Sequence, residues 1–123
     1  MTPAQIVTGY WDAMRSNDFA RAADWLAPDV EIIWPQSGEL IRGRADFAAL
    51  NHAYPGGPWR FDVQTLIADG AQVVTDTVVS DGQMTARAVT FHHVENGLIA
   101  RQREYWPDDT PAPDWRRAWV SRV

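Results

Sequence analysis

The chain has 123 residues, of which 46% are apolar and 22% are charged. This length and balance are typical of one globular domain with a substantial hydrophobic core. The sequence contains no cysteine, so disulfides, thiol catalysis and zinc–thiolate sites are excluded. The net charge is −5, and an acidic chain without a basic stripe is a poor nucleic-acid binder. All 11 basic residues are arginine, which also excludes Schiff-base catalysis by lysine.

No targeting or membrane-spanning segment is evident in the sequence. Residues 1–15 carry Asp12 and lack the apolar run of a signal peptide. No segment approaches the roughly 20 apolar residues that a helix needs to cross a bilayer. We therefore expect a cytoplasmic protein that does not bind membranes.

Helical periodicity dominates the first half of the chain. Thr2-Pro3 is typical of a helix start, and apolar residues recur at helical spacing from Ile6 to Met14. A second helical stretch must end before Pro28, because proline disrupts a helix interior. Helices are expected over residues 3–16, 19–27 and 44–54, and short strands over residues 30–34 and 38–42.

The second half changes to a period of two, which indicates strands. The dipeptides Asp81-Gly82 and Asn96-Gly97 are typical of two-residue hairpin turns. Strands are expected over residues 59–68, 72–80, 84–95 and 98–106. Helices followed by a run of strands predict an α+β fold, in which three helices cover one face of a curved, mostly antiparallel sheet. We expect one domain over residues 1–123, with 107–123 as a C-terminal tail that ends in a short helix.

The Asn96-Gly97 turn also predicts which residues of the last hairpin share a face. A two-residue turn pairs His93 with Ala100 and Phe91 with Gln102, and directly opposed residues point to the same side. The expected inner face carries Val89, Phe91, His93, Leu98, Ala100, Gln102, Glu104 and Trp106. The opposite face, with Arg101, Arg103 and Tyr105, is expected to be wet or to form a dimer surface. A one-residue bulge would exchange the two sets.

Three stretches carry a resemblance to a known family: "TGYWDAMRSNDFARAADWLAPDVEIIWP", "SGELIRGRADFAAL" and "VENGLIARQREYWPDD". They resemble the nuclear transport factor two-like superfamily and, within it, the SnoaL-like, polyketide cyclase-like proteins. The resemblance implies a cone-shaped α+β barrel with a deep hydrophobic pocket and a homodimer formed through the outer face of the sheet. The fold hosts enzymes, binding proteins and accessory domains alike, so it does not fix a function.

The resemblance also implies roles for individual residues. Tyr10 matches the tyrosine that steroid isomerases use as an oxyanion donor, whereas Trp34 stands where those enzymes place a general-base aspartate. Glu104 resembles one acid of the Asp-Arg-Asp set of limonene-epoxide hydrolases, whose other two members have no counterpart here. Either Glu104 or Asp108 could stand for the pocket acid of the polyketide cyclases.

Three side chains are candidates for catalysis: Glu104, Tyr10 and His93. Burial of Glu104 among aromatic residues would raise its pKa and suit it to proton transfer near neutral pH. The alternative for Glu104 is a salt bridge to an arginine. Tyr10 could polarise a substrate oxygen or be a core residue, and His93 could be a general base or a structural histidine.

A second group of residues could form the wall of a ligand pocket, since seven tryptophans exceed what a small core needs. These candidates are Trp34, Tyr54, Trp59, Phe91, Gln102 and Trp106. The alternative is that they are ordinary core residues.

The sequence has no phosphate loop, dinucleotide fingerprint or metal-binding signature, so neither a cofactor nor a metal is expected. The leading hypothesis is a cofactor-independent isomerase, cyclase or hydrolase that acts on a small apolar molecule, cyclic or carbonyl-bearing. One alternative is a non-catalytic homodimer that binds such a molecule. Another is a module that serves only dimerisation and whose interior is filled by side chains.

Overall fold

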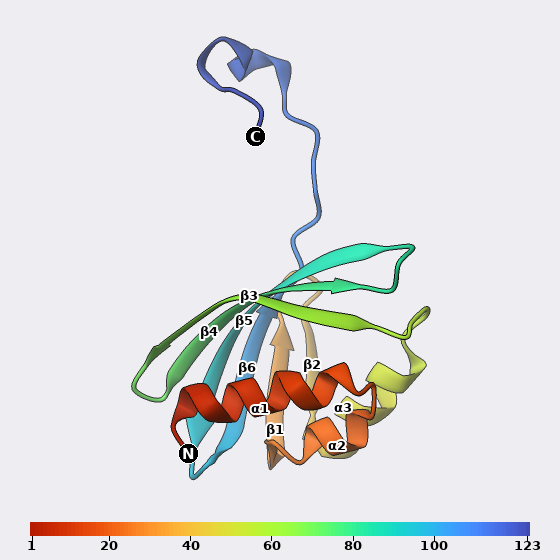
Figure 1. Ribbon diagram of the computed structural model, residues 1–123, viewed down its shortest axis with the longest axis vertical. Coiled ribbons are helices and arrows are strands. Elements are labelled where there is room, and N and C mark those ends of the chain that lie inside the picture. The colour runs from red at the N-terminus through yellow and green to blue at the C-terminus, as the bar shows by residue number, and fades with distance from the viewer.

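The computed structural model describes residues 1–123 as a curved sheet whose concave side is covered by helices (Figure 1). The elements are α1 (Pro3–Arg15), α2 (Phe19–Ala23), β1 (Leu26–Trp34), β2 (Glu39–Arg42), α3 (Gly43–Ala53), β3 (Arg60–Asp69), β4 (Gln72–Ser80), β5 (Thr85–Glu95), β6 (Leu98–Tyr105) and the 3₁₀ helix η1 (Asp114–Trp119). Six strands form one unclosed sheet in the order β2-β1-β6-β5-β4-β3. The predicted α+β class with a curved sheet is confirmed.

Helix α1 crosses the concave face and carries much of the core (Figure 1). It begins with a capping box: Thr2 Oγ1 accepts the Gln5 backbone N–H, while the Gln5 side chain accepts the Thr2 N–H. Its buried face consists of Ile6, Val7, Tyr10, Trp11, Ala13 and Met14. The apolar periodicity that predicts this helix therefore also identifies the side that packs on the sheet.

The second helix is shorter than the sequence predicts. Helix α2 ends at Ala23, and β1 already begins at Leu26, which pairs with Ile99 of β6 in parallel orientation. The Ile99 backbone N–H donates to the Trp25 carbonyl oxygen at 3.0 Å. A partner more than 70 residues away in sequence thus draws this segment into a strand, which local periodicity cannot reveal.

The turn between β4 and β5 is not the predicted two-residue hairpin. Ser80 pairs with Thr85, so residues 81–84 form a four-residue loop. Within it, the Asp81 carboxylate accepts the backbone N–H groups of Gln83 and Met84 at 3.0 and 2.8 Å. These and other backbone hydrogen bonds lower the pKa of Asp81.

The last hairpin contains a bulge that changes the predicted register. Glu95 pairs with Leu98 as expected, but His93 pairs with Arg101 rather than with Ala100. Ala100 is therefore the additional, unpaired residue on β6. From Arg101 onward, each residue of β6 pairs with β5 one position away from the predicted register. As a result Thr90 and His92, not Phe91 and His93, share the concave face with Gln102 and Glu104.

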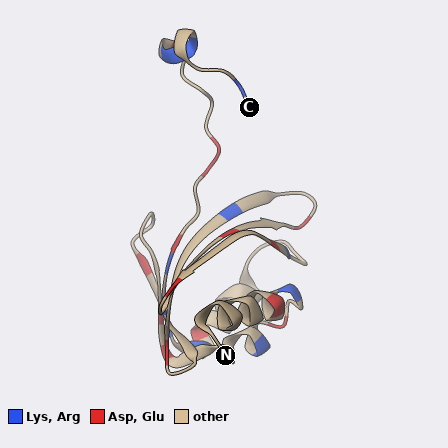
Figure 2. Ribbon diagram, turned by 60° about the vertical axis from the view of Figure 1, so that its left-hand side comes forward, with Lys and Arg blue, Asp and Glu red and all other residues tan.

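Residues 107–123 leave the body after β6 and extend away from it (Figure 2). The expected short helix is the 3₁₀ helix η1, whose Trp115 and Trp119 are 73% and 78% exposed. These indoles do not pack on the body of the same chain. None of the helices combines the length and the apolar character that crossing a bilayer demands.

Candidate functional site

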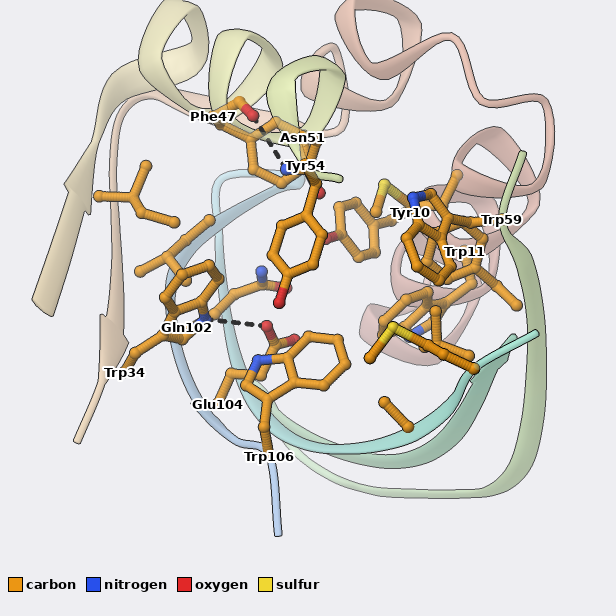
Figure 3. Close-up of a pocket in the computed structure, with 17 residues that line it drawn as sticks. Tyr10, Trp11, Trp34, Phe47, Asn51, Tyr54, Trp59, Gln102, Glu104 and Trp106 are labelled. Atoms are coloured by element: carbon orange, nitrogen blue, oxygen red, sulfur yellow. Dashed lines mark hydrogen bonds between the residues drawn. The ribbon is translucent and has the colours of Figure 1, made fainter. Parts of the chain in front are cut away.

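A cavity lies between α1, α3 and the concave face of the sheet (Figure 3). Its empty space is about 710 Å³ when the open mouth is included, and 14 of its 17 lining residues are apolar. The remaining three are Asn51, Gln102 and Glu104. No arginine or histidine is part of the lining, so the single carboxylate is not paired with a cation there.

Four aromatic residues of the cavity wall stand at the ends of secondary-structure elements. Trp34 ends β1, Tyr54 follows α3, Trp59 precedes β3 and Trp106 follows β6. Tyr54 is 48% exposed and the three indoles are partly buried, so these rings line the more open part of the cavity. All four belong to the candidate wall that the sequence suggests.

Glu104 points from β6 into the cavity and is only 7% exposed (Figure 3). Trp34 Nε1 donates to its Oε1 at 3.0 Å, and Thr90 Oγ1 donates to its Oε2 at 2.6 Å. Desolvation raises the pKa of Glu104, and hydrogen bonds from Thr90, Trp34 and Trp106 oppose part of that rise. A salt bridge, the alternative for this residue, is not formed. The group is thus a carboxyl held by neutral donors, and it can release or accept a proton at a higher pH than an exposed glutamate.

Tyr10 lies on the buried face of α1 and also lines the cavity, although only 2% of its surface is exposed. Burial raises its pKa most strongly, and the nearby Glu104 raises it further. A hydrogen bond from Gln102 has the opposite, smaller effect on the pKa. Tyr10 is therefore a neutral phenol at physiological pH and can act as a hydrogen-bond donor.

Gln102 connects this part of the cavity to a second polar group in the core. His92 Nδ1 lies 2.5 Å from Gln102 Oε1, and His92 Nε2 lies 2.8 Å from Thr75 Oγ1. Thr75 Oγ1 in turn accepts the indole N–H of Trp11 at 3.2 Å. Burial lowers the pKa of His92 to about 4, so its ring is neutral. Sequence reasoning missed His92 as a functional candidate, because the predicted register placed it on the outer face.

The bulge at Ala100 removes two of the predicted site residues from the cavity. His93 points outward, where its Nε2 lies 2.8 Å from Glu95 and its Nδ1 contacts Gln72. Phe91 is also on the outer face, with the Arg103 guanidinium 4.6 Å from its ring centroid. The predicted inner position of His93 and Phe91 is therefore wrong. Gln102 and Glu104 do point to the inner face, as predicted.

Several cavity residues were not among the sequence-based candidates. For one of them, Met14, the helical spacing could have predicted a place in the cavity. Met14 lies one helical turn after Tyr10, and residues four apart share a helix face. Phe47 of α3 and Phe61 of β3 also line the cavity. Their contribution depends on how α3 and β3 meet α1, which no local pattern encodes. Asp108, the alternative pocket acid, lies in the exposed tail.

The arrangement can transfer protons but offers no site for a metal ion. No group of three or more histidine, aspartate or glutamate side chains is close enough to hold one. What the cavity does bring together is a neutral phenol, a carboxyl with a raised pKa and a primary amide, inside aromatic walls. Such a set can hold an apolar ring, donate a hydrogen bond to an oxygen and accept a proton.

Comparison with known proteins gives the family. A model of the SnoaL-like domain matches residues 7–102. The chain belongs to the SnoaL-like domain family. No match was found among curated proteins.

Solved structures of SnoaL-like and related proteins have the same architecture. A protein from Kribbella flavida DSM 17836, provisionally named a ketosteroid isomerase, is 32% identical with a TM-score of 0.91, over 98% of this chain and 89% of that one. A nuclear transport factor two-like protein of unknown function from Burkholderia xenovorans LB400 is 30% identical with a TM-score of 0.83, over 98% and 94%. An epoxide hydrolase of the limonene-epoxide hydrolase type from M. tuberculosis is 21% identical with a TM-score of 0.70, over 85% and 82%. The predicted resemblance and the cone-shaped fold of the nuclear transport factor two-like superfamily are confirmed.

Proposed function

We propose that this protein is a cofactor-independent enzyme of the isomerase, cyclase or hydrolase type that moves a proton on a small, apolar, cyclic or carbonyl-bearing molecule. One observation carries the proposal: Glu104, the only carboxylate of an aromatic cavity, is desolvated and has no cationic partner. Carboxylates whose pKa is strongly shifted by burial are found mainly at functional sites. The 32% identical Kribbella flavida protein, with its provisional isomerase name, is consistent with chemistry of this class.

The roles follow from the donors and acceptors of the site. The ionised carboxylate of Glu104 would remove a proton from the carbon beside a carbonyl group. The electron pair of that C–H bond would form a C=C bond and shift charge to the carbonyl oxygen, which Tyr10 would stabilise by donating its O–H. Glu104, now protonated, would return the proton to another atom of the substrate. The rings of Trp34, Trp59 and Trp106 would hold the apolar body of the substrate.

The test uses 5-nitrobenzisoxazole, an apolar aromatic compound that needs only a base to open. Removal of its ring C–H proton breaks the N–O bond and releases a coloured cyanophenolate. We expect Glu104→Gln to lower the rate about 100-fold or more, the usual contribution of a positioned general base. Glu95→Gln is the matched control, because Glu95 is an exposed carboxylate at the end of β5. Equal rates for the wild type and Glu104→Gln would contradict the proposed role.

The rate should also depend on pH in a defined direction. Only the ionised carboxylate is a base, and the pKa of Glu104 is raised. The rate should therefore increase with pH, with an inflection above the ordinary value of about 4.3 for glutamate. An inflection at or below that value would mean that Glu104 is not the base.

A second candidate function is binding without catalysis. The observation that favours it is that the cavity holds one carboxylate and neither a second acid nor an arginine. A hydrolase of the Asp-Arg-Asp type could not work with this set. Recovery of a bound neutral ligand unchanged after incubation, together with no Glu104-dependent opening of benzisoxazole, would select this reading.

We also propose a cytoplasmic homodimer that pairs through the outer face of the sheet. That face carries Phe91, Arg103 and Tyr105, and Ile33 at 43% exposure. Light scattering at micromolar concentration should give twice the mass of the 13.9 kDa chain. A monomeric mass would contradict the dimer.

A further inference from the structure

Two loops from different parts of the chain meet at the open part of the cavity. Residues 54–59 join α3 to β3, and residues 81–84 join β4 to β5. Both loops continue from one pair of strands, because Arg60 at the start of β3 pairs with Ser80 at the end of β4. Each loop contributes one exposed lining residue: Tyr54 is 48% exposed and Met84 is 50% exposed. All other lining residues are buried or partly buried, so Tyr54 and Met84 mark the entrance of the cavity.

A single carboxylate connects these two loops. Asp81 Oδ1 accepts the backbone N–H groups of Gln83 and Met84 within its own loop, at 3.0 and 2.8 Å. Its Oδ2 accepts the backbone N–H of Gly57 at 3.1 Å, and this is the only hydrogen bond between the two loops. Hydrogen bonds from the N–H groups of Met84, Gly57 and Gln83 lower the pKa of Asp81, so the carboxylate is ionised at neutral pH. The contact between the loops is thus a charge-assisted hydrogen bond.

The first loop is held at its far end and approaches Asp81 at a glycine. The Asn17 side chain donates to the Trp59 carbonyl oxygen at 2.7 Å and accepts the Trp59 N–H at 2.8 Å. Gly56 has a φ of 103°, in the region that favours glycine. A Cβ at this position would lie 2.7 Å from Asp81 Oδ2, so no side chain separates the loop from the carboxylate. The Gly57 hydrogen bond therefore has to break before residues 55–58 can separate from residues 81–84.

We propose that Asp81 is a positioning residue that holds the two loops together across the entrance, so that apolar ligands pass between Tyr54 and Met84 when the bond to Gly57 opens. This inference rests on the proposed function only in taking the cavity as a ligand site. Asp81 is not part of the cavity lining. It should therefore control the rates of ligand entry and exit, while the interior side chains determine the affinity.

The substitution Asp81→Asn breaks this contact selectively. The asparagine oxygen can still accept the N–H groups of Gln83 and Met84, which leaves the side-chain N–H₂ group facing the Gly57 N–H. The opposite orientation would keep one hydrogen bond and lose two, so it is disfavoured. Asp76→Asn is the matched control, because Asp76 pairs with Arg87 on the neighbouring strand and does not line the cavity.

The first measurement tests the hydrogen bond itself. Amide hydrogen exchange, followed by NMR, reports how often the Gly57 N–H is free. We expect its exchange to be about threefold to tenfold faster in Asp81→Asn than in the wild type, as the loss of one net hydrogen bond would give. Asp76→Asn should exchange like the wild type. Equal exchange in the wild type and Asp81→Asn would show that Asp81 does not hold the loop.

The second measurement follows ligand passage with 2-acetonaphthone, an uncharged aromatic ketone that quenches tryptophan fluorescence. In stopped-flow experiments we expect Asp81→Asn to raise the association and dissociation rate constants together, about threefold or more, while Kd changes less than about twofold. Both rates rise because an easier way in is also an easier way out. Unchanged rates, or a change in dissociation alone, would overturn the proposal.

A double substitution tests the route. Tyr54→Ala removes one side of the entrance and should raise both rate constants as well. In that background Asp81→Asn should add little, since residues that act on one passage are not additive. An effect of Asp81→Asn that is equally large with and without the Tyr54 ring would place ligand passage elsewhere and contradict the proposal.

The outcomes separate this inference from the proposed function. Faster passage of acetonaphthone in Asp81→Asn, without any Glu104-dependent opening of benzisoxazole, would support the entrance and contradict catalysis. Glu104-dependent opening with unchanged passage rates would support catalysis and contradict the entrance. If the wild type does not bind acetonaphthone at all, the cavity does not admit apolar rings of this size and the inference fails.

Discussion

The hydrogen bond from Thr90 to Glu104 allows a sharp test of how the cavity holds its carboxyl. The two residues are direct cross-strand partners, both are buried, and Thr90 Oγ1 donates to Glu104 Oε2 at 2.6 Å. Thr90→Val replaces the hydroxyl by a methyl group at nearly constant volume. The substitution therefore removes this bond with little change in packing.

The cost of Thr90→Val should depend on pH. A hydrogen bond to an ionised group contributes about 1.5–3 kcal/mol, and one between neutral groups about 0.5–1.5 kcal/mol. Since this bond lowers the pKa of Glu104, its removal raises that pKa further. The folded variant then binds more protons than the wild type in the range where Glu104 titrates, so its stability falls more steeply as the pH rises. We expect a smaller loss at pH 5, where Glu104 binds more protons, than at pH 9: about 0.5–1.5 kcal/mol for the bond to the neutral carboxyl and about 1.5–3 kcal/mol for the bond to the ionised one.

Urea unfolding followed by tryptophan fluorescence at both pH values measures this difference, and Thr77→Val is the matched control. Thr77 is equally buried on the neighbouring strand, but its hydroxyl has no hydrogen-bond partner. Its replacement should leave stability unchanged or raise it by up to about 1 kcal/mol, independent of pH. If Thr90→Val costs the same at pH 5 and pH 9, or no more than Thr77→Val, the carboxyl is not held in the way described. The benzisoxazole rate of Thr90→Val should also have its inflection at higher pH than the wild type.

Two substitutions and one truncation provide further tests. Because the pKa of Glu104 is raised, the folded wild type should lose stability as the pH rises from the ordinary glutamate range through that pKa. Urea unfolding of Glu104→Gln should not show this decline. If the stabilities of the two proteins changed in parallel with pH, burial would not raise the pKa of Glu104. Gly9→Ala would gain about 1 kcal/mol in an open helix. Here the new Cβ would overlap the Trp25 ring, so we expect a lower melting temperature. A higher melting temperature would show that the ring moves aside freely. The tail segment η1 buries no side chain. Removal of residues 110–123 should therefore leave the melting temperature of the monomeric body unchanged. A clear decrease would reveal contacts between the tail and the body.

Local patterns were sufficient for most of the secondary structure. Thr2-Pro3 and the helical spacing from Ile6 to Met14 predicted both α1 and its buried face, and β4 occupies its predicted range. The second helix was predicted too long, because the parallel pairing of Leu26 with Ile99 competes with helix formation only once β6 is in place. The two-residue turn predicted at Asp81-Gly82 was also wrong. The Asp81 carboxylate accepts backbone N–H groups of Gln83 and Met84 and so stabilises a longer loop.

The sequence by itself determined the α+β class, the curved sheet under α1, and the presence of Tyr10 and Glu104 among the cavity residues. Tertiary structure alone decided which histidine of the adjacent pair faces inward. A strand alternates faces with a period of two, so the single additional residue Ala100 exchanges His92 and His93 without leaving a mark on local hydrophobicity. The hydrogen bonds that join Thr75, His92 and Gln102 exist only because the paired strands place the bulge there.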